Sequence, residues 1–347
     1  MYKLSAFAEL HKKGCCKRQP FFIIVNVLYY FRVSMNMKSA NTVFKNIIYF
    51  FAVCSLPFVF TACEDTVKPP ITETVLIVEN TQRALLVYNG STNTTASGSL
   101  ANPVFDQIIA QKTNNLIAAN LQLKTLSYLI PLYFKSATND TPFIAPFITE
   151  FFHAVAGPDT TAVPTFWMNN SYIGNASTTA ADINFQFNKN ITGATPIIGV
   201  AATAKPLANN NIEIKLKAKA FDNLSGDYHL SVMVIEKAVD GYQAGATGSF
   251  ITHKQVIRGS AVQNAIGIPI AFSSNALLSN PAKNSEIEKT INFQFEATRQ
   301  TVRDNYPSLI YWDYLQENTS VIVSVWKKTT NPNKPFEFVN AIGVDVK

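Results

Sequence analysis

Cysteine is the side chain with the widest chemistry, because its thiolate can exchange disulfides, hold a metal or act as a nucleophile. The chain of 347 residues has four cysteines, Cys15, Cys16, Cys54 and Cys63, all within its first 63 residues. The remainder of the chain has no thiol. We therefore expect no disulfide, no thiolate metal site and no cysteine nucleophile in that part.

Cys63 lies at the end of a stretch that is typical of a lipoprotein signal peptide. Lys38 and Lys45 supply a positive start, and residues 47–60 supply an apolar segment of signal-peptide length. The residues Phe60-Thr61-Ala62-Cys63 resemble a lipobox. We predict that Cys63 is lipidated, because several acyl chains together anchor a protein stably to a membrane.

Two other interpretations of this stretch remain open. It could be an ordinary signal peptide with a chance cysteine, or a single transmembrane helix, which Pro57 would interrupt. Glu64 and Asp65 directly follow Cys63, and acidic residues there resemble a surface-export signal of lipoproteins from the Bacteroidota. The predicted location is the outer membrane, lipid-anchored, at the cell surface.

The leader and the segment after it are set apart from the folded part. Residues 1–62 are the predicted signal peptide, with residues 1–34 interpreted as an over-extended start before an initiator at Met35 or Met37. An unusually long leader is the alternative. Residues 63–75 form the predicted lipidated tether, in which Pro69-Pro70 favours extended backbone.

The net charge of +6 at pH 7 comes from the leader. Eight of the 29 Lys and Arg residues precede Cys63, but only one of the 23 Asp and Glu residues does. The rest of the chain carries 21 basic and 22 acidic residues, with no basic cluster that could neutralise phosphates. We expect no nucleic-acid partner.

No GxSxG, GxGxxG or Walker motif occurs in the sequence. The histidines after Cys63 are His153, His229 and His253. They lack metal-ligand spacing, although His229 and His253 could meet on neighbouring strands near Glu236. The turn from Asp222 to Asp227 could hold calcium but lacks an EF-hand run of ligands. The sequence predicts no metal, no cofactor and no enzymatic activity.

An aromatic cluster lies near the carboxyl end of the chain. Tyr311, Trp312 and Trp326 form a candidate binding surface, because tyrosine and tryptophan stack on sugars and anchor peptides. The alternative is that these side chains pack a short helix onto the fold.

Residues 76–175 are predicted to alternate between strand and helix. The predicted strands are residues 83–88, a segment within 121–134, and 162–167, and the predicted helices are residues 102–119 and 142–156. This order resembles a thioredoxin-like domain. In that fold the loop after the first strand carries a cysteine pair, and a cis-proline faces it.

The resemblance places the two cysteine positions at Asn93 and Ala96 and the cis-proline at Val163-Pro164. Neither Asn93 nor Ala96 forms a thiolate, so we expect a degenerate domain that cannot exchange disulfides. Asn93, Ala96 and Pro164 remain a candidate ligand groove.

Residues 182–347 are predicted to be strands throughout. Residues 211–220 alternate strictly, with Ile212 and Leu216 on one face and Lys215 and Lys219 on the other. We interpret the charged face as solvated rather than as a binding patch. Ile183–Phe187 and Ile291–Phe295 share the sequence INFQF, and both are predicted strands. The predicted fold is an antiparallel β-sandwich after the α/β domain.

A family resemblance rests on five stretches of this β-rich part: Tyr228–Glu236, Tyr242-Gln243, His253–Gly259, Val321–Val325 and Val339–Ala341. They resemble the outer-membrane-protein-twenty-eight family, lipoproteins of the Bacteroidota. The resemblance covers roughly residues 75–347. It implies a thioredoxin-like region followed by a β-domain, a surface or outer-membrane location, and adhesion or ligand binding. The missing cysteine pair departs from the family.

We therefore expect a lipid-anchored surface protein that acts as a non-enzymatic binding or adhesion module for a protein or glycan ligand. The alternative is an envelope thioredoxin-like protein with a chaperone-like or vestigial redox role. A purely structural component of the envelope is a third hypothesis.

Overall fold

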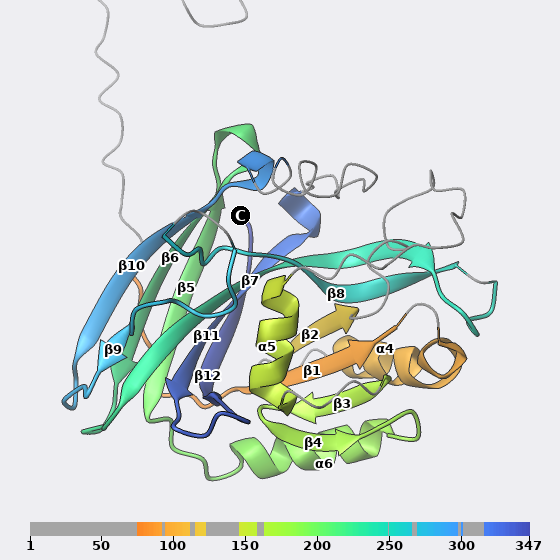
Figure 1. Cartoon of the computed structure of the whole chain (residues 1–347), viewed down its shortest axis with the longest axis horizontal. Coiled ribbons are helices and arrows are strands. Elements are labelled where there is room, and N and C mark those ends of the chain that lie inside the picture. Colours follow the sequence, from red (N-terminus) through yellow and green to blue (C-terminus); the bar gives the residue numbers. More distant parts are fainter. Residues whose placement is uncertain are drawn as a thin grey trace, which may run out of the picture. The chain divides into compact units, whose positions relative to one another are not determined.

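The structure, a computed structural model, describes residues 75–91, 94–111, 115–122, 146–157, 163–248, 250–265, 269–297, 300 and 316–347. Residues 74–347 form one compact unit of mixed α/β structure with few helices (Figure 1). Among the described residues, no helix is both long and apolar enough to cross a membrane. The prediction of mixed α and β structure is confirmed at this level.

A nine-stranded open sheet forms the larger layer. Its order is β12-β11-β7-β8-β2-β1-β3-β4, with β9 beside β7. The bounds are β1 Ala84–Gly90, β2 Leu116–Gln122, β3 Thr165–Met168, β4 Ser171–Gly174, β7 Asp227–Tyr242, β8 Phe250–Ser260, β9 Leu278–Ser279, β11 Thr319–Lys328 and β12 Phe336–Asp345. β2 is parallel to β1 and β8, and the other neighbours are antiparallel.

Strands from both predicted domains share this sheet, because β2 pairs with β8 at Asn120 and Val256. A boundary near residue 182 stays a prediction.

Helices cover both faces of the part of the sheet formed by β1 to β4. Successive residues of β1 point to opposite faces, so Leu86 and Tyr88 join one apolar cluster while Leu85 and Val87 join another. α4 (Asn102–Ala110) and α6 (Ala180–Ile191) supply the first cluster, and α5 (Pro146–Ala156) supplies the second. Figure 1 shows α5 in front of β1 and β2.

The helix predicted over residues 102–119 is wrong in its second half. The structure ends α4 at Ala110 and begins β2 at Leu116. β2 pairs along its whole length with β1, from Ala84 opposite Leu116 to Gly90 opposite Gln122. The ladder hydrogen bonds of that pairing outweigh the helical spacing of the apolar residues. Residues 123–145, which hold the rest of the second predicted strand, lie outside the described residues.

The strand predicted at Ile183–Phe187 is also wrong, because these residues form the middle of α6. Thr179 accepts a hydrogen bond from the Asp182 amide at 3.2 Å, and Asp182 accepts one from the Thr179 amide at 2.8 Å. This capping box starts the helix. Ile183 and Phe187 then lie four residues apart on its buried face.

A second sheet of three strands, in the order β10-β6-β5, packs against the larger one. Its strands are β5 Ile198–Pro206, β6 Ile212–Ala220 and β10 Glu286–Phe293. The predicted alternation of β6 is confirmed, because Ile212 and Leu216 are fully buried. On its other face Lys217 pairs with Glu286 and Glu288 at 2.8 and 3.1 Å, so this charge is matched within the sheet.

The buried Asn340 of β12 ties three segments together. Its Oδ1 accepts the Arg83 amide at 3.0 Å, and its Nδ2 donates to the carbonyls of Thr81 and Ile198 at 3.0 and 2.9 Å. β12 is thereby held beside the entry to β1 and the start of β5. A buried amide with all these partners fixes the register of the strands it joins.

Candidate functional site

The predicted ligand groove lies where β1 ends and β3 begins. Asn89 of β1 is opposite Thr165 of β3, and the Asn89 side chain donates to Thr165 Oγ1 at 3.4 Å. Pro164 directly precedes Thr165, is buried, and follows a cis peptide bond, as predicted for Val163-Pro164. The loop after β1 and Pro164 therefore lie at the same end of the paired strands.

Ala96 lies in that loop, half-buried, at the start of a short π-helix (Ser97–Ala101) that leads into α4. Asn93 lies outside the described residues. The structure thus brings the loop of Ala96 to the strand end beside Pro164, and it leaves Asn93 undescribed.

Hydroxyl groups occupy this loop. Thr94 Oγ1 lies 2.7 Å from Ser97 Oγ, and Ser97 Oγ accepts the Ser91 amide at 3.2 Å. Burial raises the pKa of the neighbouring Tyr88, although the Ser97 side chain opposes the shift, so the phenol stays neutral. Hydroxyl groups cannot exchange disulfides, because that reaction needs a thiolate.

The turn between β7 and β8 closes over the loop, through the buried Gln243. Its Nε2 donates to the carbonyls of Ser91, Thr94 and Ala244 at 3.1, 3.2 and 3.2 Å. Its Oε1 accepts from Asn102 Nδ2 of α4 at 3.0 Å. One side chain therefore satisfies polar groups of the loop and of the helix start at once.

Two glycines allow this close approach. A Cβ at Gly98 would overlap the Ala244 carbonyl oxygen and would lie 2.8 Å from the Ala246 nitrogen. Gly245 has a φ of +77°, and a Cβ there would lie 2.6 Å from the Thr95 carbonyl oxygen. Only a residue without a side chain fits at these contacts. The space beside the loop after β1 is therefore occupied by the backbone of the turn between β7 and β8.

An ion pair adds to the contact between α4 and β8. Asp106 of α4 lies 3.6 Å from Lys254 Nζ of β8. Burial raises the pKa of Asp106, and the nearby Lys254 ammonium opposes that shift. The pair joins the helix after the loop to the strand after the covering turn.

The other predicted site residues divide into two groups. Trp326 is fully buried, with Phe151 and Phe338 in edge contact at ring-centroid distances of 5.5 and 5.4 Å. It is therefore unavailable at a surface, and its place in a binding surface was wrong. The second group lies outside the described residues: Cys63, Glu64, Asp65, Tyr311 and Trp312.

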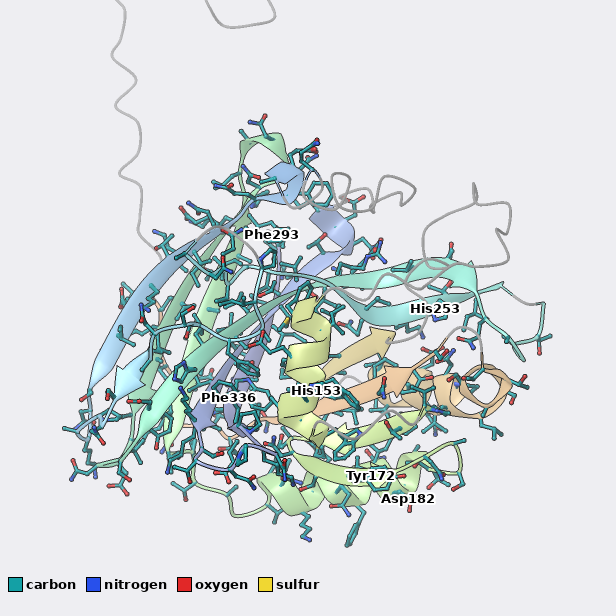
Figure 2. The ribbon with its side chains drawn as sticks, viewed as in Figure 1. His153, Tyr172, Asp182, His253, Phe293 and Phe336 are labelled. Carbon is teal, nitrogen blue, oxygen red and sulfur yellow. The ribbon has the colours of Figure 1, made fainter. Side chains whose placement is uncertain are left out.

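The two histidines that could have met on neighbouring strands lie apart. His229 of β7 contacts Phe336 with ring centroids 5.5 Å apart, and its Nδ1 lies 2.7 Å from the Ser273 carbonyl oxygen. His253 of β8 is opposite Val239. Figure 2 shows His253 on the right of the view and Phe336 left of its centre. Among the described residues no three His, Cys, Asp or Glu side chains are grouped to hold a metal.

An open groove beside β12 was missed by sequence analysis. It has a volume of about 640 Å³ and lies where β2, β5, β11 and β12 approach one another. Ile117, Ala202 and Ile322 contribute to its apolar floor, and Lys205 and Lys237 to its rim. Its only local sequence signal is the alternation of Gly343, Asp345 and Lys347 with valines at the end of the chain. The other walls come from strands far apart in sequence.

Comparisons with known proteins identify a likeness of fold alone. No family model matches the chain, and no curated protein matches it. Among solved structures, HBP35 of Porphyromonas gingivalis, a member of the Bacteroidota, matches with a TM-score of 0.52 and 12% identity, over 78% of this chain and 77% of HBP35. A protein from Archaeoglobus fulgidus matches with a TM-score of 0.20 and 12% identity, over 43% of this chain and 95% of its own.

Proposed function

We propose that this chain is a lipid-anchored protein of the outer membrane or cell surface in a bacterium of the Bacteroidota, and that it acts as a non-enzymatic binding or adhesion module. Two independent features of the chain support this proposal. The lipobox-like end at Cys63 supports the anchor. The filled loop after β1 supports the absence of catalysis.

The absence of catalysis is supported chiefly by the position of Gln243, whose side chain fills the space over the loop after β1. The strand order β2-β1-β3-β4, with helices on both faces and Pro164 beside the loop, is the arrangement expected of a thioredoxin-like domain. In such a domain the loop after β1 would face solvent and substrate. Here Gln243 and the backbone of residues 244–246 occupy that space, and the loop has no thiol.

The proposed architecture is a degenerate thioredoxin-like region at residues 76–175 followed by a β-sandwich at residues 182–347. The packing of β5, β6 and β10 against β7, β11 and β12 supports the sandwich. The likeness of fold to HBP35 of Porphyromonas gingivalis supports a common architecture for most of the chain.

The intact mass of the protein extracted from membranes tests the anchor. We expect a chain that begins at Cys63 and carries acyl groups, and we expect Cys63→Ala to lose them. A mass that retains residues before Cys63, unchanged in Cys63→Ala, would contradict the anchor.

Retention of whole cells by coated surfaces tests the binding role. Surfaces coated with candidate proteins or glycans should retain cells that carry the protein and should not retain cells that carry Cys63→Ala. Equal retention of both would argue against an adhesion module at the surface.

An envelope thioredoxin-like protein with a chaperone-like or vestigial redox role is the second candidate, and the strand order β2-β1-β3-β4 favours it. An insulin-reduction assay on the full chain tests the absence of redox catalysis. We expect no reduction above the uncatalysed rate. Measurable turnover would overturn the non-enzymatic proposal.

A further inference from the structure

We infer that the groove beside β12 binds a small amphipathic carboxylate, a molecule with an apolar chain and one negative head group. This inference rests on the proposed binding function and names the class of ligand. A volume of about 640 Å³ falls in the ordinary range for sites that hold small molecules.

The floor of the groove is apolar and accessible. Ile117 of β2 and Ile322 of β11 belong to the apolar cluster under α5, and they also line the groove. Ala202 of β5 and Gly343 of β12 contribute small residues, so no large side chain fills the space above them. An apolar chain placed there would continue the core of the protein and lose contact with water.

The rim carries more positive than negative side chains. Lys237 and Lys347 share one carboxylate, Asp345, at 3.4 and 4.0 Å. Lys205 of β5 has no ion pair with any residue in the described part of the chain. The lysine–glutamate ladder of β6 and β10 differs, because two glutamates there face Lys217 at 2.8 and 3.1 Å. The unmatched rim charge favours an anionic head group.

The lining also argues against other classes of ligand. No aromatic side chain of the described residues lines the groove, whereas sugars and bases are usually held by stacking on aromatic rings. An extended peptide would need free backbone groups at the strand edge. The end of β12 is already engaged there, because the Lys347 amide donates to the Ala204 carbonyl at 3.0 Å.

The test is isothermal titration of the full chain, held in nanodiscs of uncharged phospholipid, with empty nanodiscs as the blank. The probes are octanoate, its neutral counterpart 1-octanol and its cationic counterpart octyltrimethylammonium. We expect saturable binding of octanoate at one site, about fivefold tighter than octanol, because exposed charge pairs contribute modestly. We expect the cation to bind most weakly.

Four variants locate the binding. Gly343→Leu should weaken octanoate at least tenfold, because a Cβ there already lies 3.6 Å from Ile117 Cδ1 and a larger side chain would occupy the groove. Lys205→Gln combined with Lys237→Gln should weaken octanoate about fivefold, to the affinity of octanol, and leave octanol unchanged. Asp345→Asn should tighten octanoate about twofold. The matched control, Lys189→Gln with Lys283→Gln, changes exposed lysines outside the groove and should have no effect.

Absence of octanoate binding to the unmodified chain would overturn this ligand assignment, as would equal affinity for octanoate and octanol. Octanoate binding that is insensitive to both Gly343→Leu and the double lysine variant would also overturn it. The lysine variant keeps the test decisive if Gly343→Leu unfolds the protein. The lipid anchor and adhesion are tested separately, by the intact mass and by the retention of whole cells. A failure of octanoate binding is therefore distinguishable from a failure of the proposed function.

Discussion

The loop after β1 and the groove beside β12 differ in how their polar groups are used. In the loop, Gln243 satisfies three carbonyls and one amide, and the turn that carries it packs to within van der Waals contact. In the groove, two lysines share one aspartate, and an apolar floor stays open. A site whose groups satisfy one another has little left to offer a ligand, whereas an unmatched rim can gain by binding.

The sharpest way to break this comparison is to add one methyl group to each region. Gly98→Ala should destabilise the protein by about 3 kcal/mol, because its Cβ overlaps the Ala244 carbonyl and the turn must move. Gly343→Ala, the matched control, meets Ile117 at an ordinary 3.6 Å and should change the free energy of unfolding by less than about 0.5 kcal/mol. Urea unfolding measures both. Equal effects would mean that the loop is not tightly closed.

Removal of the Gln243 amide should have the next largest effect. Gln243→Leu keeps the size of the buried side chain but takes away its donor and its acceptor, and should cost about 2 kcal/mol of unfolding free energy. Hydrogen exchange should also rise in residues 94–101. Gln263→Leu, at an exposed position, is the control and should change stability by about 0.5 kcal/mol or less. If Gln243→Leu leaves the free energy of unfolding unchanged, the Gln243 side chain does not hold the loop closed.

A smaller effect is expected at Asp106, beside the closed loop. Burial raises the pKa of Asp106 above its value in the unfolded chain, so the stability tied to its protonated form is lost as pH rises through the folded-state pKa. Asp106→Asn should therefore gain stability relative to the unmodified protein on the alkaline side of that pKa. Thermal unfolding across pH 3 to 7 follows the difference. A variant that loses stability as pH rises would show that the ion pair with Lys254 dominates instead.

The smallest effect, of opposite sign, is expected at the exposed Glu286. Hydrogen bonds from Lys217 and Lys219 lower the pKa of Glu286, so the stability it adds is present at neutral pH and is lost as pH falls through the folded-state pKa. Glu286→Gln should be slightly less stable than the unmodified protein at pH 7, with the difference vanishing in acid. The same thermal series measures it. A difference in stability between Glu286→Gln and the unmodified protein that stays the same at all pH values would show that the titration of Glu286 is not its cause.

The sequence INFQF marks the limit of prediction from local pattern. At Ile291 it lies largely in β10, and at Ile183 it lies in α6, although both copies alternate apolar and polar residues. The capping box of Thr179 and Asp182 decides the second case, and it lies outside the repeated stretch. A similar limit explains β2, whose helical spacing was overridden by pairing with β1.

The cis bond at Val163-Pro164 could be predicted because the order of strands and helices over residues 76–175 resembles that of a thioredoxin-like domain. The closed loop could not, since Ser91 and Gln243 lie 152 residues apart. The groove could not either, because its walls come from β2, β5, β11 and β12. Trp326 illustrates the same difficulty: an aromatic residue in a strand gives no sign of which face it occupies until its neighbours are known.

Hydrogen exchange of the full chain in nanodiscs, with and without saturating octanoate, tests the contrast between the two regions most directly. We predict slower exchange in residues 116–118 and 343–347, which line the groove, and no change in residues 94–101 and 243–248. Protection of the loop and its covering turn, with none at β2 and β12, would contradict this prediction. That result would mean that the turn opens and that the loop after β1, rather than the groove, receives the ligand.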